Sequence, residues 1–187
     1  MDAFENLVAE IFWKEGYWTQ TSFKVDLSKE EKRRLGNPSM PRPEIDVLAY
    51  KGSGNVLKII ECKSFIDSRG VRLRDVDGTD ADGAKRYKLF RNDELRMIVF
   101  DRLRTELSKR GACRDDVKMT LCLACGRIAT DRDRSQLQSY FKEHGWELFD
   151  EQWLVSRLRA MADIGYENQV ATVVAKLLLR GKLPDRE

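Results

Sequence analysis

Three charged residues lie within two strand-like segments of the sequence and could together act on a substrate. Asp46 lies inside the first segment, whereas Glu61 and Lys63 lie at the end of the second. Alternate side chains of a strand point to the same face, so Glu61 and Lys63 are predicted to project together while Cys62 points into the core. Pairing of the two segments would place Asp46 beside them.

This group of residue types is suited to holding a hard divalent cation. Two carboxylates at one point are the ligands that Mg2+ prefers, with water in its remaining positions. A lysine ammonium beside the ion can orient or deprotonate an attacking water and stabilise the charge that grows on a phosphate. A lone Glu-x-Lys is more often a surface ion pair of little energetic weight. The apolar neighbours in this hairpin favour the metal site, because a charge buried without a partner or a metal is costly.

The segments around these residues predict both strands and helices. Apolar runs and alternation predict strands at residues 17–25, 44–50, 56–62, 117–124 and 146–149. The glycine-rich stretch 51–55 is predicted to turn the chain between the second and third strands. Helical spacing and capping residues predict helices at residues 4–15, 28–36, 84–110 (with a break at 92–93), 132–144, 150–161 and 167–180. Residues 37–43 and 67–83 are predicted to be loops.

Strands that alternate with helices after an initial hairpin predict an α/β fold with a mixed sheet. A chain of 187 residues is long enough for one domain with a sizeable core. We expect this core to span residues 1–160, with residues 161–187 as a C-terminal helical extension of the same domain.

The composition excludes several classes of protein but indicates no activity. Hydrophobic residues make up 42% and charged residues 35%, which is typical of a soluble globular chain, and the net charge of +3 is only mildly basic. No apolar run reaches the length of a membrane helix, because the best stretch, residues 170–179, contains Lys176. The acidic N-terminus is unlike a secretory signal, and four cysteines are too few for a disulfide scaffold, so a cytoplasmic location is expected.

The hairpin resembles the signature of the PD-(D/E)XK nuclease superfamily. It reads Pro-Glu-Ile-Asp from Pro43 to Asp46, then has fourteen intervening residues, and then reads Glu-Cys-Lys from Glu61 to Lys63. Two residues separate Pro43 from Asp46, whereas the short form of the signature has them adjacent. The resemblance implies a restriction-endonuclease-like fold, a mixed central sheet flanked by helices.

The same resemblance implies a role for each residue of the site. Asp46, Glu61 and the backbone carbonyl of Cys62 would bind Mg2+ or Mn2+, and Lys63 would activate water or stabilise the transition state. Many members of the superfamily also carry a metal-associated glutamate on the first helix. Glu5 lies at the margin of the apolar arc of that predicted helix, so it can reach the sheet and complete the acidic cluster.

The other glutamate of the first predicted helix that we considered, Glu10, points well away from the apolar arc, so it is not expected to reach the sheet. In the C-terminal half, a strand, a helix and a short strand that ends at Asp150 are similar to the closing portion of Mrr-like restriction endonuclease domains. The resemblance covers roughly residues 1–160. It implies Mg2+- or Mn2+-dependent hydrolysis of phosphodiester bonds in DNA.

Basic residues follow the hairpin closely enough to hold a DNA backbone near the site. A solvated charged loop is the plain alternative, because aspartates are interleaved with these cations. The candidates for DNA contact are Arg69, Arg72, Arg74, Lys85, Arg86 and Lys88.

Other motifs favour structural roles. Cys122 and Cys125 form a single CxxC without a second pair, which favours buried thiols over zinc binding. His144 precedes a glycine at the end of a predicted helix and suits a cap. The aspartates of residues 75–82 resemble a calcium loop, but the glycine and the closing glutamate that such a loop requires are missing.

The sequence thus predicts a metal-dependent DNA endonuclease, with two alternatives open. One is a DNA-binding or assembly module that keeps the fold without catalysis, against which the intact Asp, Glu and Lys set argues. The other is a nuclease specific for DNA junctions or flaps. A homodimer formed through residues 167–180 would serve double-strand cutting, and a separate specificity subunit would supply target recognition. No membrane partner is expected.

Overall fold

A mixed sheet of five strands forms the centre of the protein. The structure is a computed structural model that describes residues 2–165 and 168–180. The strands are β1 (Trp18–Lys24), β2 (Glu44–Lys51), β3 (Val56–Lys63), β4 (Lys118–Cys125) and β5 (Glu147–Phe149). Their order in the sheet is β1-β2-β3-β4-β5, with antiparallel pairing from β1 to β3 and parallel pairing from β3 to β5.

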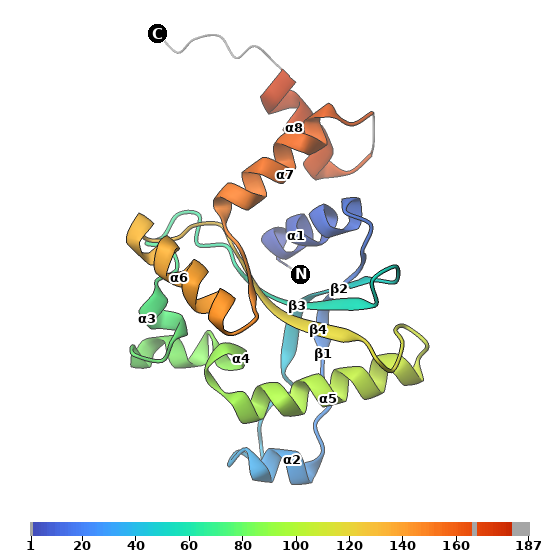
Figure 1. The fold of residues 1–187 in the computed structure, drawn as a ribbon, viewed down its shortest axis with the longest axis vertical. Coiled ribbons are helices and arrows are strands. Elements are labelled where there is room, and N and C mark those ends of the chain that lie inside the picture. The colour runs from blue at the N-terminus through green and yellow to red at the C-terminus, as the bar shows by residue number, and fades with distance from the viewer. Residues whose placement is uncertain (1, 166–167, 181–187) are drawn as a thin grey trace.

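Helices cover both faces of this sheet, as Figure 1 shows. One face carries α1 (Ala3–Lys14), α7 (Glu151–Asp163) and α8 (Val170–Arg180), and the other carries α4 (Lys88–Arg91), α5 (Asp93–Lys109) and α6 (Asp131–Glu143). Three short helices complete the described chain, namely α2 (Lys29–Arg34), α3 (Leu73–Val76) and the 3-10 helix η1 (Ala81–Lys85). The α/β class predicted from the sequence is therefore confirmed, with a mixed sheet flanked by helices.

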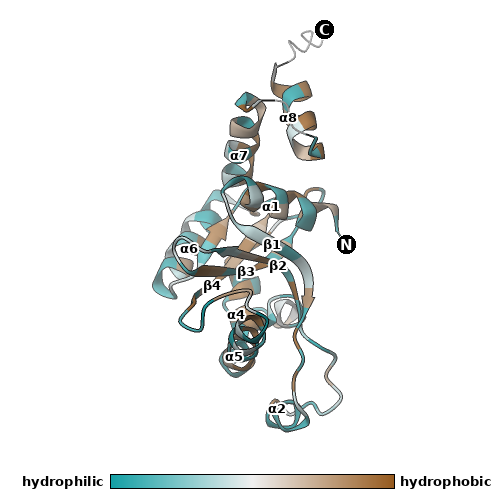
Figure 2. Cartoon of the chain, turned by 90° about the vertical axis from the view of Figure 1, so that its right-hand side faces the viewer, coloured by the Kyte–Doolittle hydropathy of each residue, from teal (hydrophilic) through white to brown (hydrophobic). Residues whose placement is uncertain are grey.

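Two hydrophobic clusters fill the spaces between the layers, and Figure 2 shows the apolar strands enclosed by the helices. The larger cluster joins α5 and α6 to the sheet through residues such as Ile59, Val99 and Phe141. The smaller cluster joins α1 and α7 to the opposite face through Val8, Ile60 and similar residues. Ile59 and Ile60 are consecutive in β3 and belong to different clusters, as the alternation of a strand requires.

Side-chain caps fix where several helices begin. The hydroxyl of Ser28 accepts the N–H of Glu31, whose carboxylate in turn accepts the N–H of Ser28, so α2 begins with a capping box. Asn92 accepts the N–H of Leu95 and begins α5, which confirms the predicted break in residues 84–110. Asp150 begins α7 in the same way, as predicted.

The remaining differences from the sequence-based expectations are local. Residues 67–83 were predicted to be a loop, but they contain α3 and part of η1. The carboxylate of Asp133 in α6 accepts the N–H of Leu73 at 3.2 Å, so the start of α3 is satisfied from a distant part of the chain. The expected domain boundary at residue 160 falls inside α7, and the C-terminal helix begins at Val170, while residues 166–167 and 181–187 lie outside the described residues.

Helix α8 packs through its small side chains and leaves its large ones exposed. Ala171, Thr172 and Ala175 are buried. The exposed side chains are Val170, Val173, Val174, Leu177, Leu178 and Leu179. Among the described residues, no helix is both long and apolar enough to cross a membrane.

Candidate active site

The strands β2 and β3 part at the point where Asp46 lies. Their ladder ends at the pair Val47–Ile60, although both strands continue beyond it. Beyond this pair a side chain replaces the backbone partner, because Oδ2 of Asp46 accepts a hydrogen bond of 2.6 Å from the backbone N–H of Cys62. The carboxylate is thus fixed against β3 by a charge-assisted hydrogen bond.

Strand β2 also changes face at Asp46. Ile45 and Val47 are two residues apart and should share a face, yet Ile45 packs in the larger cluster and Val47 in the smaller one. On β1 the residue opposite Asp46 in the register is Ser22, which has a positive φ of 51°. This irregular step frees Asp46 from both cores and leaves its side chain 20% exposed where β2 and β3 part.

Lys63 lies between the two carboxylates that the sequence predicted to share its site. Its Nζ lies 3.8 Å from Oδ2 of Asp46 and 3.7 Å from Oε2 of Glu61, and it donates a hydrogen bond of 3.0 Å to the carbonyl of Cys62. The side chains of Glu61 and Lys63 are only 12% and 17% exposed. The structure therefore places Asp46, Glu61 and Lys63 side by side, with Cys62 turned towards the smaller cluster, as the alternation of β3 predicts.

Burial makes the ionised carboxylates of this site costly. It raises the pKa of Glu61 from its ordinary value of 4.5 to about 7, with repulsion by Asp46 adding to the rise and the charge of Lys63 opposing it. The pKa of Asp46 is also raised by burial, against the attraction of Lys63 and the hydrogen bond from Cys62. One lysine is thus shared by two carboxylates, and a second cation would relieve their repulsion.

Glu5 faces the same region from α1. Its pKa is raised by burial and by the negative charge of Asp46, so the two carboxylates are close enough to repel each other. Glu10 instead accepts the backbone N–H of Ala171 at 3.3 Å and lies against α8. The sequence-based preference for Glu5 over Glu10 agrees with this geometry.

The donors at the site fit a hard divalent cation. Asp46 and Glu61 supply carboxylate oxygens, and Oδ1 of Asp46 takes no hydrogen bond within the described part of the chain. The carbonyl of Cys62 accepts a hydrogen bond from the ammonium of Lys63, which uses one of the two lone pairs of this third donor. In the described residues, no three His, Cys, Asp or Glu side chains are grouped closely enough to hold a metal by themselves, so water would complete the coordination.

A hollow with a volume of about 420 Å3 opens beside Glu61 and Lys63. Three cations predicted to contact DNA line it, namely Lys85, Arg86 and Lys88, and the charge of Lys88 acts on Glu61. Arg69 lines a neighbouring hollow. Arg72 and Arg74 line neither of these two hollows.

The structure adds lining residues that the sequence did not reveal. Pro43, Glu44, Phe65 and Leu89 also line the hollow next to Glu61. Pro43 and Glu44 stand in the signature, and their place before Asp46 was the available signal. Phe65 and Leu89 read as ordinary apolar residues, so nothing in the sequence distinguished them from the core.

Cysteine chemistry is not favoured at this site or elsewhere. Burial raises the pKa of the Cys62 thiol far above its ordinary value, and the charges of Asp46 and Glu5 raise it further. Cys122 and Cys125 are buried in β4 with raised pKa values as well. His144 ends α6, where its Nδ1 lies 2.8 Å from the carbonyl of Tyr140, which is the capping role predicted for it.

Asp150 has a structural role at the start of α7. Arg134 of α6 pairs with both Asp150 and Glu151, and the N–H of Trp153 is donated to Asp150. Glu151 also accepts the N–H of Ile128 at 3.1 Å. This network ties α6 to α7 across the end of β5.

No protein-family model, curated protein or solved structure matches this chain in the three comparisons made.

Proposed function

We propose that this protein is a metal-dependent DNA endonuclease of the PD-(D/E)XK type, in the Mrr-like branch, with a restriction-endonuclease-like core. The observation that supports this most directly is the convergence of Asp46, Glu61 and Lys63 where β2 and β3 part, with Nζ of Lys63 within 3.8 Å of both carboxylates. Asp46 and Lys63 are seventeen positions apart in the sequence, yet their side chains meet beside a hollow lined by cations.

Asp46 and Glu61 would hold Mg2+ or Mn2+, with the carbonyl of Cys62 as a further donor through the lone pair that Lys63 does not use. When bound, the cation lowers the pKa of a coordinated water and polarises a phosphoryl oxygen. Glu5, whose carboxylate is repelled by that of Asp46, would add negative charge to the site and orient water.

Lys63 has the position required to act on the reacting groups. Its ammonium lines the hollow and is held by two carboxylates and one carbonyl, so it is oriented before a substrate arrives. There it can hold a proton near an attacking water and stabilise the charge on a pentavalent phosphate. Because Glu61 has a pKa of about 7, proton release from this carboxyl accompanies full assembly of the site near neutral pH.

The cations beside the site favour a polyanionic substrate. Lys85, Arg86 and Lys88 line the hollow next to Glu61 and Lys63, where they can neutralise the phosphates that flank the reacting one. These contacts read the backbone and not the bases, so they supply affinity without sequence specificity.

Plasmid cleavage tests the proposal. Purified protein with Mg2+ or Mn2+ should nick or linearise plasmid DNA, EDTA should stop it, and Asp46→Ala and Lys63→Ala should each abolish cleavage. Lys118→Ala, which removes an exposed cation at the start of β4, serves as the control and should cleave normally. Cleavage retained by Lys63→Ala, or by wild-type protein in EDTA, would contradict the proposal. Linear duplex, branched and single-stranded DNA run in parallel would reveal a structure-specific nuclease.

A further inference from the structure

A second hollow adjoins the candidate active site. It has a volume of about 560 Å3, within the range usual for small-ligand sites. Phe65, Lys85 and Arg86 line both this hollow and the one beside Lys63, so the two are neighbours. The other residues that line the second hollow are Ser68, Arg69, Gly70, Asp75, Gly83 and Tyr87.

Close backbone approaches fix the walls of the second hollow. Gly70 has a φ of +83°, and a Cβ atom there would lie 2.9 Å from the backbone nitrogen of Ala129. The next residue, Val71, pairs with Ile128 and exchanges backbone hydrogen bonds with Arg127 and Ala129. A Cβ atom at Gly83 would lie 2.2 Å from the carbonyl oxygen of Asp75. Side chains at either glycine would push the walls apart, so the hollow has a defined shape before any ligand binds.

The charge of this lining is positive. Arg69, Lys85 and Arg86 are exposed, and none of them forms an ion pair within the described residues. Asp75 is the acidic member of the lining, and its carboxylate accepts the backbone N–H of Arg72 at 3.3 Å. Three exposed cations around one hollow are suited to an anion.

Tyr87 gives an independent sign of a missing partner. The residue is 1% exposed, and its hydroxyl is buried without a hydrogen-bond partner in the described structure. Buried hydroxyls are normally paired, since an unpaired one destabilises the fold. The ring lies 5.9 Å from Nζ of Lys63 and also lines the second hollow, so this residue connects the reacting site to the second hollow.

We propose that the second hollow binds a phosphate group, the one adjacent on the same nucleic-acid strand to the phosphate that reacts at Lys63. Phosphates repeat at short intervals along a strand, and the two hollows share three lining residues, so a single strand can present one phosphate to each. Arg69 and Arg86 supply the charge, and the Tyr87 hydroxyl, which is buried in the free protein, would donate a hydrogen bond to the phosphate once it turns into the hollow. The identity of the strand rests on the proposed function, whereas the anion site rests on the hollow itself.

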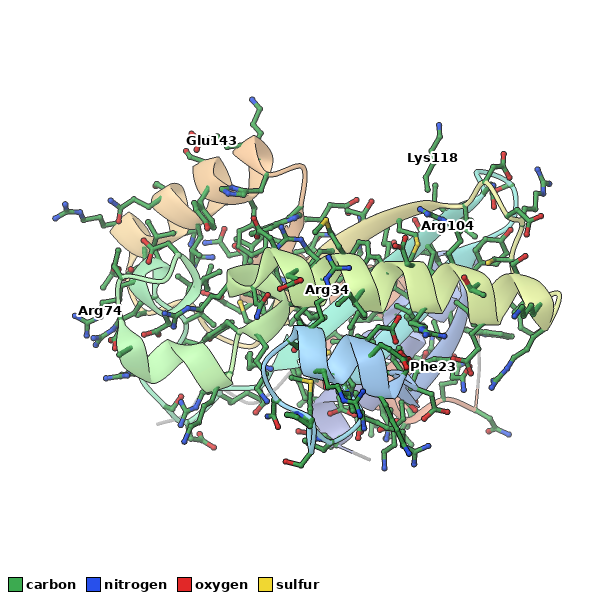
Figure 3. All side chains as sticks on the ribbon, turned by 90° about the horizontal axis from the view of Figure 1, so that it is seen from below. Phe23, Arg34, Arg74, Arg104, Lys118 and Glu143 are labelled. Carbon is green, nitrogen blue, oxygen red and sulfur yellow. The ribbon has the colours of Figure 1, made fainter. Side chains whose placement is uncertain are left out.

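Binding without metal tests this inference separately from cleavage. The probe is a labelled single-stranded DNA of 12 nucleotides, titrated with full-length protein in EDTA and followed by fluorescence anisotropy at several salt concentrations. Arg69→Ala/Arg86→Ala should weaken binding about 10-fold and lower the salt slope by about 0.7, the value for one phosphate contact on a single strand. The control variant Arg104→Ala/Lys118→Ala also removes two cations, but these lie across the molecule from Arg74 in Figure 3. It should change the affinity less than twofold. Equal losses in the two double variants would overturn the inference.

Two further measurements complete the test. Tyr87→Phe keeps the ring, so it should fold normally, bind the oligonucleotide about 5-fold more weakly and leave the salt slope unchanged. Inorganic phosphate should compete for the same site only at much higher concentration. The double variant could weaken the binding of inorganic phosphate but leave that of the oligonucleotide unchanged. This result would overturn the inference that the phosphate belongs to a nucleic-acid strand. Oligonucleotide binding with the expected losses, but no cleavage under any condition, would refute the nuclease and leave the phosphate site standing.

Discussion

The substitution Glu61→Gln removes a charge that the fold holds at a cost. Glutamine has the shape of a protonated glutamate, so the variant mimics the state that burial favours in the free protein. The pKa of Glu61 rises from 4.5 to about 7 on folding, which means that the folded protein binds this proton more tightly than the unfolded chain does. Wild-type stability should therefore fall as the pH rises from 4.5 through 7, and level off above that range.

The size of the effect follows from the same shift. Each unit of pKa shift corresponds to about 1.36 kcal/mol in the free energy of unfolding. Ionised Glu61 therefore destabilises the fold by about 3 kcal/mol above pH 8 in the absence of metal. Glu61→Gln should be more stable than the wild type by up to this amount at pH 8, equivalent to a rise in Tm of roughly 6–12 °C. At pH 4.5 the two proteins should melt together.

Thermal unfolding in EDTA between pH 4.5 and 8.5 measures this difference. Glu143→Gln is the matched control, because it removes the same charge from an exposed position at the end of α6 and should leave the pH profile unchanged. A Glu61→Gln variant that melts at or below the wild-type temperature at pH 8 would refute the reasoning. Glu61 would then be stabilised as an anion by Lys63, and the site would have no need of a second cation.

Three other predictions follow from the same contacts. Mg2+ at 100 times its Kd should stabilise the wild type by about 2.7 kcal/mol at pH 8 and leave Asp46→Asn unchanged, as calorimetry would show. Arg134→Met leaves Asp150 and Glu151 without their shared cation and should cost about 3 kcal/mol in urea unfolding; a smaller loss than that of an exposed surface arginine would contradict the network. Tyr87→Phe should stabilise the free protein by about 1 kcal/mol, because it removes a buried unpaired hydroxyl, and a lower Tm would show that water satisfies that group.

The hairpin of β2 and β3 could be predicted from the sequence because neighbouring residues determine its structure. Alternation along β3 decides that Glu61 and Lys63 share a face and that Cys62 takes the other, and a glycine-rich turn brings β2 back beside it. The same holds for helices that begin at a capping side chain, such as α5 at Asn92 and α7 at Asp150.

The parts that could not be predicted depend on distant contacts. The change of face at Asp46 accompanies a positive φ at Ser22 on the neighbouring strand β1. Neither residue type predicts this irregular backbone. The short helix α3 owes its start to Asp133, sixty residues away. The second hollow is assembled from a polar segment whose sequence is typical of an ordinary charged loop. Its shape follows from two glycines, of which Gly70 packs against the backbone of residues 127–129 and Gly83 against α3.

The turn between β2 and β3 offers a place to attach other molecules to this protein. Gly52, Ser53 and Gly54 are exposed, and the strand between them and Asp46 rises about 3.3 Å per residue, which puts them about 20 Å from the carboxylates. Asn55 should be kept, because the hydrogen bonds of its side-chain amide close the turn: it donates to Asp116 and accepts from the hydroxyl of Tyr50. A fluorescent label or an inserted module joined at Ser53 would leave open the end of the sheet that carries Asp46 and Glu61.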